Sequence, residues 1–211
     1  MPKQNELREI FEAKNKEFQR RSKALSPLEF YNALFADETK VTVIEEDKTY
    51  HNLAIEEMLN LATGRSDIYV CPTTFLRGYY SEATMKSLYA FVVDLDGVVM
   101  GGVRGAFDLF DQSRLPRPTL MVNSGQGIHA YYVLKTPVEA YKRRKAALRA
   151  TYDFLCSEWK FGAGVVDKHD IMQPFRVVGS YTKLGQQSTG WLVGDTWDIT
   201  DLAARASIEI D

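Results

Sequence analysis

Apolar residues recur at helical spacing in several stretches of this 211-residue chain, and short apolar runs of strand length separate them. Apolar positions scattered among many charges over residues 3–24 predict an amphipathic helix with one exposed face. Ser26 followed by Pro27 predicts a second helix through Phe35, because serine caps helix N-termini and proline suits the first helical position. The same spacing predicts further helices over residues 53–62, 82–88, 138–160 and 200–206.

Short apolar runs predict strands over residues 40–45, 67–71, 90–96, 119–122, 128–134, 165–166 and 175–178. The runs at 119–122 and 128–134 are separated by a short turn that contains glycine, which predicts a hairpin. A glycine-rich loop is expected after Gly97. Since strands and helices alternate without a strict βαβ rhythm, we predict an α/β or α+β domain with a mixed sheet.

Composition indicates an ordinary globular protein, because 45% of the residues are hydrophobic and 26% are charged. No apolar stretch approaches the length of a membrane span, and the polar N-terminus is not a signal peptide, so no membrane partner is expected. Cys71 and Cys156 lie far apart in unlike contexts. They favour a cytoplasmic protein with unpaired thiols and exclude a cluster of Cys and His ligands for zinc.

The charge balance does not by itself identify a partner. The chain carries 26 basic and 28 acidic residues, a net charge of −2, whereas nucleic-acid-binding domains are often basic. Local patches matter more than the sum, and one basic patch exists at residues 142–145 together with Arg149. A solvated helix face explains that patch equally well.

The run Ala90-Phe-Val-Val-Asp-Leu-Asp-Gly97 is the strongest candidate for chemistry. It has the length and composition of a buried strand, and residues i and i+2 of a strand point to the same face. Asp94 and Asp96 would therefore project together at the strand end. Hard divalent cations such as Mg²⁺ or Mn²⁺ prefer carboxylate oxygens and would offset their repulsion. A polar strand end that enters a glycine turn is the simpler alternative.

A second motif, Asn123-Ser-Gly-Gln-Gly-Ile-His129, lies between two predicted strands. Glycines let a backbone approach an anion closely, and exposed N–H groups with a serine hydroxyl can hold phosphate oxygens. His129 begins the following strand, so its ring can reach the same cleft. A hairpin turn with an incidental histidine is the alternative.

A third block begins at Val165-Val-Asp-Lys-His-Asp170 and continues through Phe175-Arg-Val-Val-Gly-Ser-Tyr-Thr-Lys183. Here a carboxylate again follows a short apolar run, and a basic residue lies inside the next one. Arg176 and Lys183 would suit a triphosphate, because arginine offers a planar fork and lysine a point charge. A buried ion pair between Arg176 and Asp170 is a serious competing explanation.

In this order the three blocks resemble the archaeo-eukaryotic primase superfamily, and within it the primase-polymerases of plasmids, phages and related mobile elements. The family pattern is D-x-D or D-x-E at a strand end, then S-x-G-x-H or S-x-H, then a hydrophobic residue followed by Asp, commonly trailed by R-x-x-G-(S/T)-x-x-K. The match covers about residues 89–184. One departure concerns the third carboxylate, for which Asp167 is favoured and Asp170 is an alternative.

The resemblance implies template-directed nucleotidyl transfer with nucleoside triphosphates on a single-stranded DNA template and primer. It implies that two Mg²⁺ or Mn²⁺ ions are held by Asp94, Asp96 and Asp167. The triphosphate would be held by Ser124, Gly125, Gly127, His129, Arg176 and Lys183. The basic patch would then contact the template through Arg143, Arg144 and Arg149.

The resemblance also implies the domain organisation. Residues 1–211 would form one primase-polymerase catalytic domain, a possible fragment of a larger replication protein with a helicase domain or partner. Its fold would pair an N-terminal α/β unit, about residues 1–85, with an RRM-like unit, about residues 86–211, and the active cleft would lie between two mixed or antiparallel sheets.

Two other functions stay open at this point. The sequence from Asp94 to Val98 also resembles the first motif of haloacid-dehalogenase-type phosphatases, with Asp94 as the nucleophile. Their acidic motif would come from near the C-terminal end, from Asp195 with Asp198 or Asp201. His129 and the stretch 176–183 would have no role in that enzyme. A third possibility is a nucleic-acid-binding domain without catalysis, which three retained carboxylates argue against.

Overall fold

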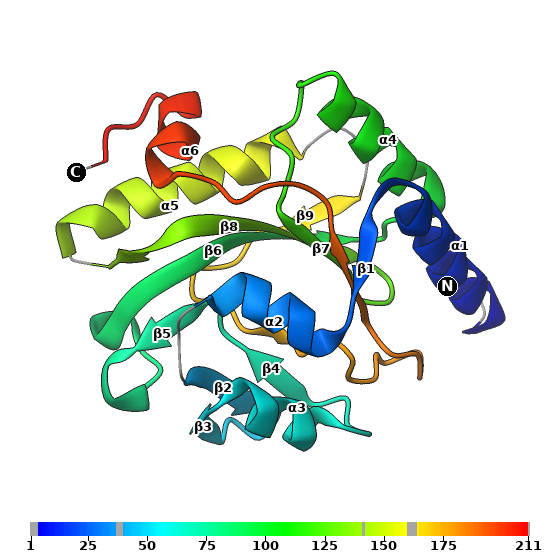
Figure 1. Ribbon diagram of the computed structural model, residues 1–211, viewed down its shortest axis with the longest axis horizontal. Coiled ribbons are helices and arrows are strands. Elements are labelled where there is room, and N and C mark those ends of the chain that lie inside the picture. The colour runs from blue at the N-terminus through cyan, green and yellow to red at the C-terminus, as the bar shows by residue number, and fades with distance from the viewer. Residues whose placement is uncertain (1–3, 37–39, 141, 160–163, 211) are drawn as a thin grey trace.

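Two antiparallel sheets and the helices that cover them form the protein (Figure 1). The computed structural model describes residues 4–36, 40–140, 142–159 and 164–210. The larger sheet has the strand order β1-β11-β7-β8-β6-β5, and β9 pairs with β6 as well. Its strands are β1 (Lys23–Leu25), β5 (Thr73–Phe75), β6 (Met85–Asp96), β7 (Leu120–Asn123), β8 (Ile128–Glu139), β9 (Val165–Asp167) and β11 (Thr189–Leu192).

The smaller sheet has the order β10-β4-β2-β3. Its strands are β2 (Val41–Glu45), β3 (Tyr50–Leu53), β4 (Ile68–Val70) and β10 (Phe175–Arg176). The helices are α1 (Gln4–Arg21), α2 (Pro27–Phe35), α3 (Ile55–Ala62), α4 (Met100–Asp111), α5 (Lys142–Glu158) and α6 (Ile199–Arg205), with short 3₁₀ turns η1 (Leu76–Gly78) and η2 (Glu82–Thr84). The predicted fold class, an α/β or α+β domain with a cleft between two sheets, is therefore confirmed.

Each face of the larger sheet packs on its own apolar core. One core lies between this sheet and the helices α1, α4, α5 and α6. The other lies between the sheet, α2, α3 and the smaller sheet. Strand β6 belongs to both cores, since Phe91 and Val93 face the first and Ala90 and Val92 face the second. A strand buried on both faces reads as a continuous apolar run, which is why 90–96 was recognisable in the sequence.

Most predicted elements are present. Helix α2 begins as expected, with a capping box in which the Ser26 hydroxyl accepts from the Glu29 N–H and the Glu29 carboxylate accepts from the Ser26 N–H. The hairpin prediction is also confirmed, because β7 and β8 pair antiparallel with Asn123 opposite Ile128.

Two predictions were wrong. The helix expected over 82–88 is only the 3₁₀ turn η2, and β6 already begins at Met85. The glycine-rich loop expected after Gly97 is largely helix α4. Its apolar residues recur at helical spacing and pack into the first core, which outweighs the low helix propensity of its glycines. These buried residues are Val103, Ala106, Phe107 and Phe110.

The division of the chain at about residue 85 stays a prediction. Strands of both sheets lie on either side of that point in the sequence, since β1 joins the larger sheet and β10 joins the smaller one. Cys71 and Cys156 are both buried and form no disulfide within the described residues, and burial raises the pKa of the Cys71 thiol. Among the described residues, no helix has the length and apolar character that crossing a membrane requires.

The glycines of α4 offer a test of this helix. A Cβ atom at Gly105 would meet no heavy atom within 4 Å. Gly105→Ala should therefore raise the free energy of unfolding by about 0.5–1 kcal/mol, because alanine loses less backbone entropy in a helix. Gly64→Ala is the matched control, since its site is equally open but its φ is +74°. The control should destabilise the protein, and urea denaturation of both variants measures the difference.

Candidate active site

The site is assembled where β6 ends between two neighbouring strands. Asp94 lies directly opposite His129 of β8 on one side and opposite Asp167 of β9 on the other. Directly opposed residues of antiparallel strands project to the same face of the sheet. That face is the one that packs on the smaller sheet, because Asp94 follows Val92 and Ala90 in the alternation. The structure thus brings three residues from three separate motifs together.

Two carboxylates and one imidazole form a cluster that could hold a metal ion. Ligand atoms of Asp94, Asp167 and His169 lie within 4.8 Å of one another. The Nε2 atom of His169 is 3.1 Å from the Asp167 Oδ2 atom and 3.7 Å from the Asp94 Oδ2 atom. The His169 backbone N–H donates to the hydroxyl of Tyr152 at 3.3 Å, which anchors the histidine. Carboxylate oxygens with one imidazole fit a divalent cation such as Mn²⁺ or Mg²⁺.

Electrostatics at this cluster favour a cation. Burial, and then the neighbouring charge of Asp96, raise the pKa of Asp94 to about 7. Burial lowers the pKa of His129 to about 3, so this imidazole is neutral at physiological pH. Its Nε2 atom lies 3.5 Å from the Asp94 Oδ1 atom, and its buried Nδ1 atom has no hydrogen-bond partner in the part of the chain that the structure describes. A bound cation would offset the repulsion that the acidic residues exert on one another.

A small, mostly polar pocket of about 280 Å³ is lined by Asp96, which lies two residues beyond Asp94 in β6. Five of the residues predicted to bind nucleotide line it, as do Asp96 and three residues that sequence reasoning did not single out. The complete lining is Asp96, Ser124, Gly125, Gln126, Gly127, Arg176, Thr182, Lys183 and Leu184. Asp96 is exposed and does not belong to the cluster of Asp94, Asp167 and His169, and the predicted ligand His129 lies beside Asp94 without lining the pocket.

The glycines of the 123–129 turn were predicted to let the backbone approach an anion, and close packing also requires them. A Cβ atom at Gly127 would lie 2.2 Å from the Leu95 carbonyl oxygen, so only glycine lets the turn approach β6. Gly125 has a φ of +117°, a backbone conformation that other residues rarely adopt. These two glycines bring the turn against the end of the strand that carries Asp94 and Asp96.

Arg176 faces the pocket without a carboxylate partner in the described part of the chain. Its guanidinium carbon lies 5.2 Å from the centroid of the Tyr69 ring. The guanidinium also donates a hydrogen bond to the Tyr181 carbonyl at 3.2 Å. The alternative of an Arg176–Asp170 ion pair is therefore not observed. Asp170 pairs with Arg149 at 3.3 Å and accepts from the Met172 N–H.

Buried hydrogen bonds hold the start of the loop that carries Lys183. The Val178 N–H donates to the Tyr31 hydroxyl at 2.8 Å, and the buried Ser180 hydroxyl donates to the Val177 carbonyl at 2.6 Å. Gly179 has a φ of +89°, and a Cβ atom there would lie 2.6 Å from the Pro27 side chain. The glycine and serine of the R-x-x-G-S-x-x-K stretch thus shape the loop, while its arginine and lysine line the pocket.

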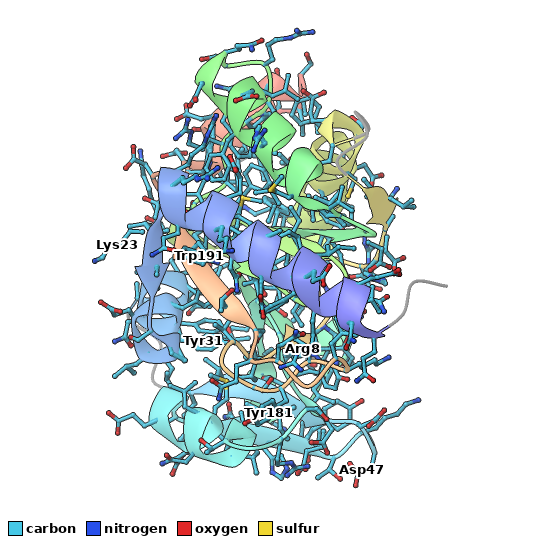
Figure 2. The ribbon with its side chains drawn as sticks, turned by 90° about the vertical axis from the view of Figure 1, so that its right-hand side faces the viewer. Arg8, Lys23, Tyr31, Asp47, Tyr181 and Trp191 are labelled. Carbon is cyan, nitrogen blue, oxygen red and sulfur yellow. The ribbon has the colours of Figure 1, made fainter. Side chains whose placement is uncertain are left out.

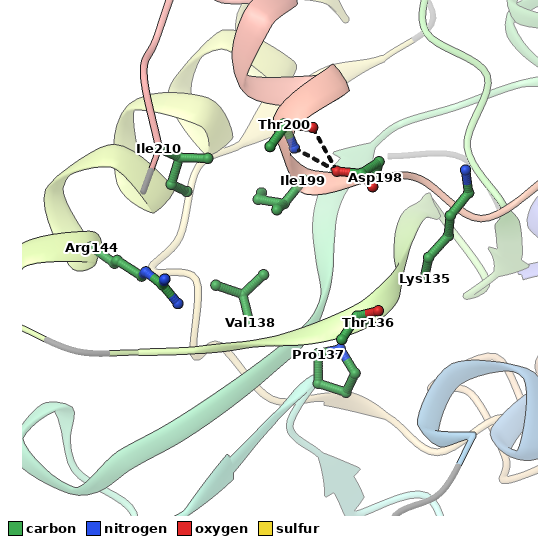
Figure 3. A pocket seen from close by; sticks show the side chains of 9 residues that line it. All are labelled: Lys135, Thr136, Pro137, Val138, Arg144, Asp198, Ile199, Thr200 and Ile210. Carbon is green, nitrogen blue, oxygen red and sulfur yellow. Dashed lines mark hydrogen bonds between the residues drawn. The ribbon is translucent and has the colours of Figure 1, made fainter.

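Two of the three arginines predicted to bind the template, Arg144 and Arg149, do not line the pocket that contains Asp96. Arg144 lines another pocket, between the far end of β8, α5 and α6, which it shares with Lys135 and Asp198 (Figure 3). Arg149 pairs with Asp170 and with Glu82 at 3.0 Å. The side chain of Arg143 lies outside the described part of the structure. A template role for these three arginines stays a prediction.

His169 is the main residue of the cluster that sequence reasoning missed. It lies two residues after Asp167, and the alternation of an extended strand places two such residues on one side. That spacing was a usable signal, because Asp-x-His combines two common metal ligands. Thr182 and Gln126 carried no comparable signal, since each is an ordinary polar residue within a loop.

No family model matches this chain, and no curated protein matches it either. The arrangement of the two sheets is that of the archaeo-eukaryotic primase (AEP) fold, as the comparison with solved structures shows. Among solved structures, the chain is similar to the primase-polymerase (PrimPol) AEP domain of cyanophage S-2L, with a TM-score of 0.59 and 16% sequence identity. The alignment covers 82% of this chain and 93% of that domain. The resemblance stated from the motifs is thus confirmed at the level of the fold.

Asp94→Asn should stabilise the protein by about 1–2 kcal/mol at about pH 8 without divalent ions, because it removes a half-buried like charge. The pKa of Asp94 is raised in the folded state, so its ionisation costs stability as the pH rises from about 4 to about 7. The gain should accordingly shrink at about pH 5. Urea denaturation at both pH values measures this difference in the free energy of unfolding, and Asp195→Asn, at an exposed aspartate, is the control. A loss of stability at both would contradict this electrostatic assignment.

Proposed function

We propose that the protein is a template-directed nucleotidyltransferase of the primase-polymerase kind. It transfers the nucleoside monophosphate unit of a nucleoside triphosphate to the 3′-hydroxyl of a primer on a single-stranded DNA template, and pyrophosphate leaves. The observation that carries this proposal is the adjacency of two different surfaces: the cluster of Asp94, Asp167 and His169, and the polar pocket that Arg176 and Lys183 line. One surface suits divalent cations and the other suits a polyphosphate. Phosphoryl and nucleotidyl transfer need both within the length of a triphosphate.

We infer that Asp94, Asp96 and Asp167 hold two Mg²⁺ or Mn²⁺ ions, and that His169 adds an imidazole ligand. Bound there, the ions would polarise the reacting phosphate and lower the pKa of the attacking hydroxyl. Asp94 and Asp167 lie opposite each other in neighbouring strands, so their separation is set by the sheet. Asp167 is preferred to Asp170 as the third carboxylate, because Asp170 is engaged with Arg149 and Asp167 is close to Asp94.

The pocket residues would bind and orient the triphosphate. The Arg176 guanidinium can donate to two phosphate oxygens at once, and Lys183 adds a point charge from the exposed side of the pocket. Ser124 can donate its hydroxyl, and the turn that contains Gly125 and Gly127 brings backbone N–H groups close to the ligand. The neutral His129 would act beside Asp94, since its Nε2 atom lies 3.5 Å from the Asp94 Oδ1 atom.

The phosphatase alternative lacks support from the arrangement of its residues. Asp195, Asp198 and Asp201 line a different pocket together with Arg117 and Trp197, and none of them belongs to the Asp94 cluster in the described chain. Asp94 instead meets carboxylate and imidazole groups from β9 and β8, which suits a metal ligand better than a nucleophile. Single-stranded DNA and nucleoside triphosphates are therefore the proposed partners. A helicase partner and a cytoplasmic location stay predictions.

Extension of a labelled primer on a single-stranded template, with nucleoside triphosphates and Mn²⁺ or Mg²⁺, tests the proposal. Asp94→Ala and Asp167→Ala should each lower extension at least about a hundredfold, because metal ligands in such sites are not replaceable by water. The matched control is Asp195→Ala, an exposed aspartate in another pocket, which should extend like the natural protein.

The same proteins should be incubated with p-nitrophenyl phosphate and, separately, with the template alone. Phosphate release that depends on Asp94, in the absence of extension, would replace the proposal by the phosphatase function. Template binding without either activity would leave a binding domain and would equally contradict nucleotidyl transfer.

Lys183→Gln should raise the KM for nucleoside triphosphate by about tenfold with a smaller change in kcat, since it removes one charged contact to the phosphates. Lys23→Gln is a matched control, because Lys23 is also exposed but lies in β1, outside the pocket. Steady-state extension kinetics with the nucleotide varied give both constants. Equal KM values for the two variants would remove Lys183 from the binding role.

A further inference from the structure

Helix α1 contains a lysine that no catalytic motif explains. Lys14 is completely buried, yet its ammonium group reaches the turn between β7 and β8. The Nζ atom donates to the Gly125 carbonyl at 2.8 Å and to the Gly127 carbonyl at 2.9 Å. Among the described residues, no carboxylate lies within ion-pair distance of it. Burial lowers the pKa of Lys14 to about 7, as expected for a cation without a counter-charge.

The other buried charge of α1 behaves in the ordinary way. Glu17 is paired with arginines of its own helix and with Arg104 of α4 at 3.4 Å, so it ties the two helices together. Within the described residues Lys14 has no such ion-pair network, and its ammonium group hydrogen-bonds to the backbone of the turn. Burying an unpaired ammonium is costly, and an apolar side chain of similar length would fill the same volume without that cost. Its contact with the turn therefore calls for a functional explanation.

The geometry of the planar peptide bond provides a functional explanation for this contact. In a trans peptide the C=O and the following N–H point in opposite directions. Because Lys14 draws the Gly125 carbonyl inward, the N–H of Gln126 is directed away from the core. Gln126 is exposed and lines the pocket that also contains Ser124 and Arg176. Lys14 thus leaves a backbone donor free for an anion on the opposite side of the turn.

Helix α1 is held firmly enough for this role. The Asn123 side chain donates to the Phe11 carbonyl at 3.0 Å and to the Asn15 side chain at 2.8 Å, and Thr189 of β11 donates to the same Asn15 oxygen at 2.8 Å. The ring of Phe18 stacks on the ring of Trp191 of β11, with the ring centroids 5.6 Å apart. In Figure 2, α1 crosses the front of the molecule over the strand that carries Trp191. The helix backbone from which Lys14 extends is therefore anchored to the sheet.

We propose that Lys14 is a positioning residue for polyphosphate binding. It fixes the turn at residues 125–127 so that the Gln126 N–H donates to a phosphate oxygen bound in the pocket beside Asp96. The chemical class of ligand is a polyphosphate chain. That this chain belongs to a nucleoside triphosphate rests on the proposed function, whereas the binding of the phosphates does not.

The test uses inorganic tripolyphosphate without divalent ions, so that neither metal loading nor polymerisation affects the result. Lys14→Met should weaken tripolyphosphate binding about tenfold by calorimetry, because the turn loses its charged donor. In the natural protein, the amide of Gln126 should shift in ¹H–¹⁵N spectra as tripolyphosphate is added. That shift should be lost in Lys14→Met. Lys16→Met is the matched control, since Lys16 is an exposed lysine of the same helix.

A merely structural lysine would lower the melting temperature of Lys14→Met without changing the affinity of the folded protein for tripolyphosphate, and that result would overturn the proposal. Should Lys14→Met fail to fold, the natural protein decides alone, because an unresponsive Gln126 amide contradicts the proposal and a responsive one supports it. A protein that does not extend primers but whose tripolyphosphate binding depends on Lys14 would refute the proposed function and leave this inference standing.

Discussion

The register of β6 against its two neighbours is the constraint on which the site depends. Asp94 lies opposite His129 in β8 and opposite Asp167 in β9. The site therefore forms only when β6 pairs in the right register with both neighbouring strands. A slip of one residue would turn the shifted side chains to the opposite face of the sheet. Packing opposes such a slip, since Phe91 and Val93 would exchange cores with the smaller or differently placed Ala90 and Val92. Burial of the strand thus specifies the geometry of its charged end.

The same arrangement sets stability against function. Apolar packing covers both faces of β6 up to Asp94, where charged groups meet at the margin of the second core. A carboxylate in that place raises the energy of the metal-free fold, as the raised pKa of Asp94 indicates. Such locally unfavourable groups are common at functional sites, because selection for activity outweighs their cost in stability.

Sequence reasoning succeeded where the signal was local. The apolar run before Asp94 predicted its strand, and the glycines around Gln126 predicted a turn at the site. It failed where a distant element decides the outcome. Helix α4 forms despite its glycines because its apolar face packs into the first core, and the glycines concealed the helical spacing of that face in the sequence. Lys14 resembles any lysine of an exposed helix, and only the fold brings it to a turn more than a hundred residues away.

Long sequence separations within the site have a consequence for how the chain folds. Lys14 and Gly125 are separated by 111 residues, and the Asn15–Thr189 contact spans 174. Closing such loops costs entropy before any contact compensates for it, so contacts of this kind form late and folding is slow. During synthesis α1 emerges well before β11, and the turn between β7 and β8 keeps its contacts with both only after β11 has formed. The polar pocket that contains Asp96 is therefore among the last parts of the molecule to become ordered.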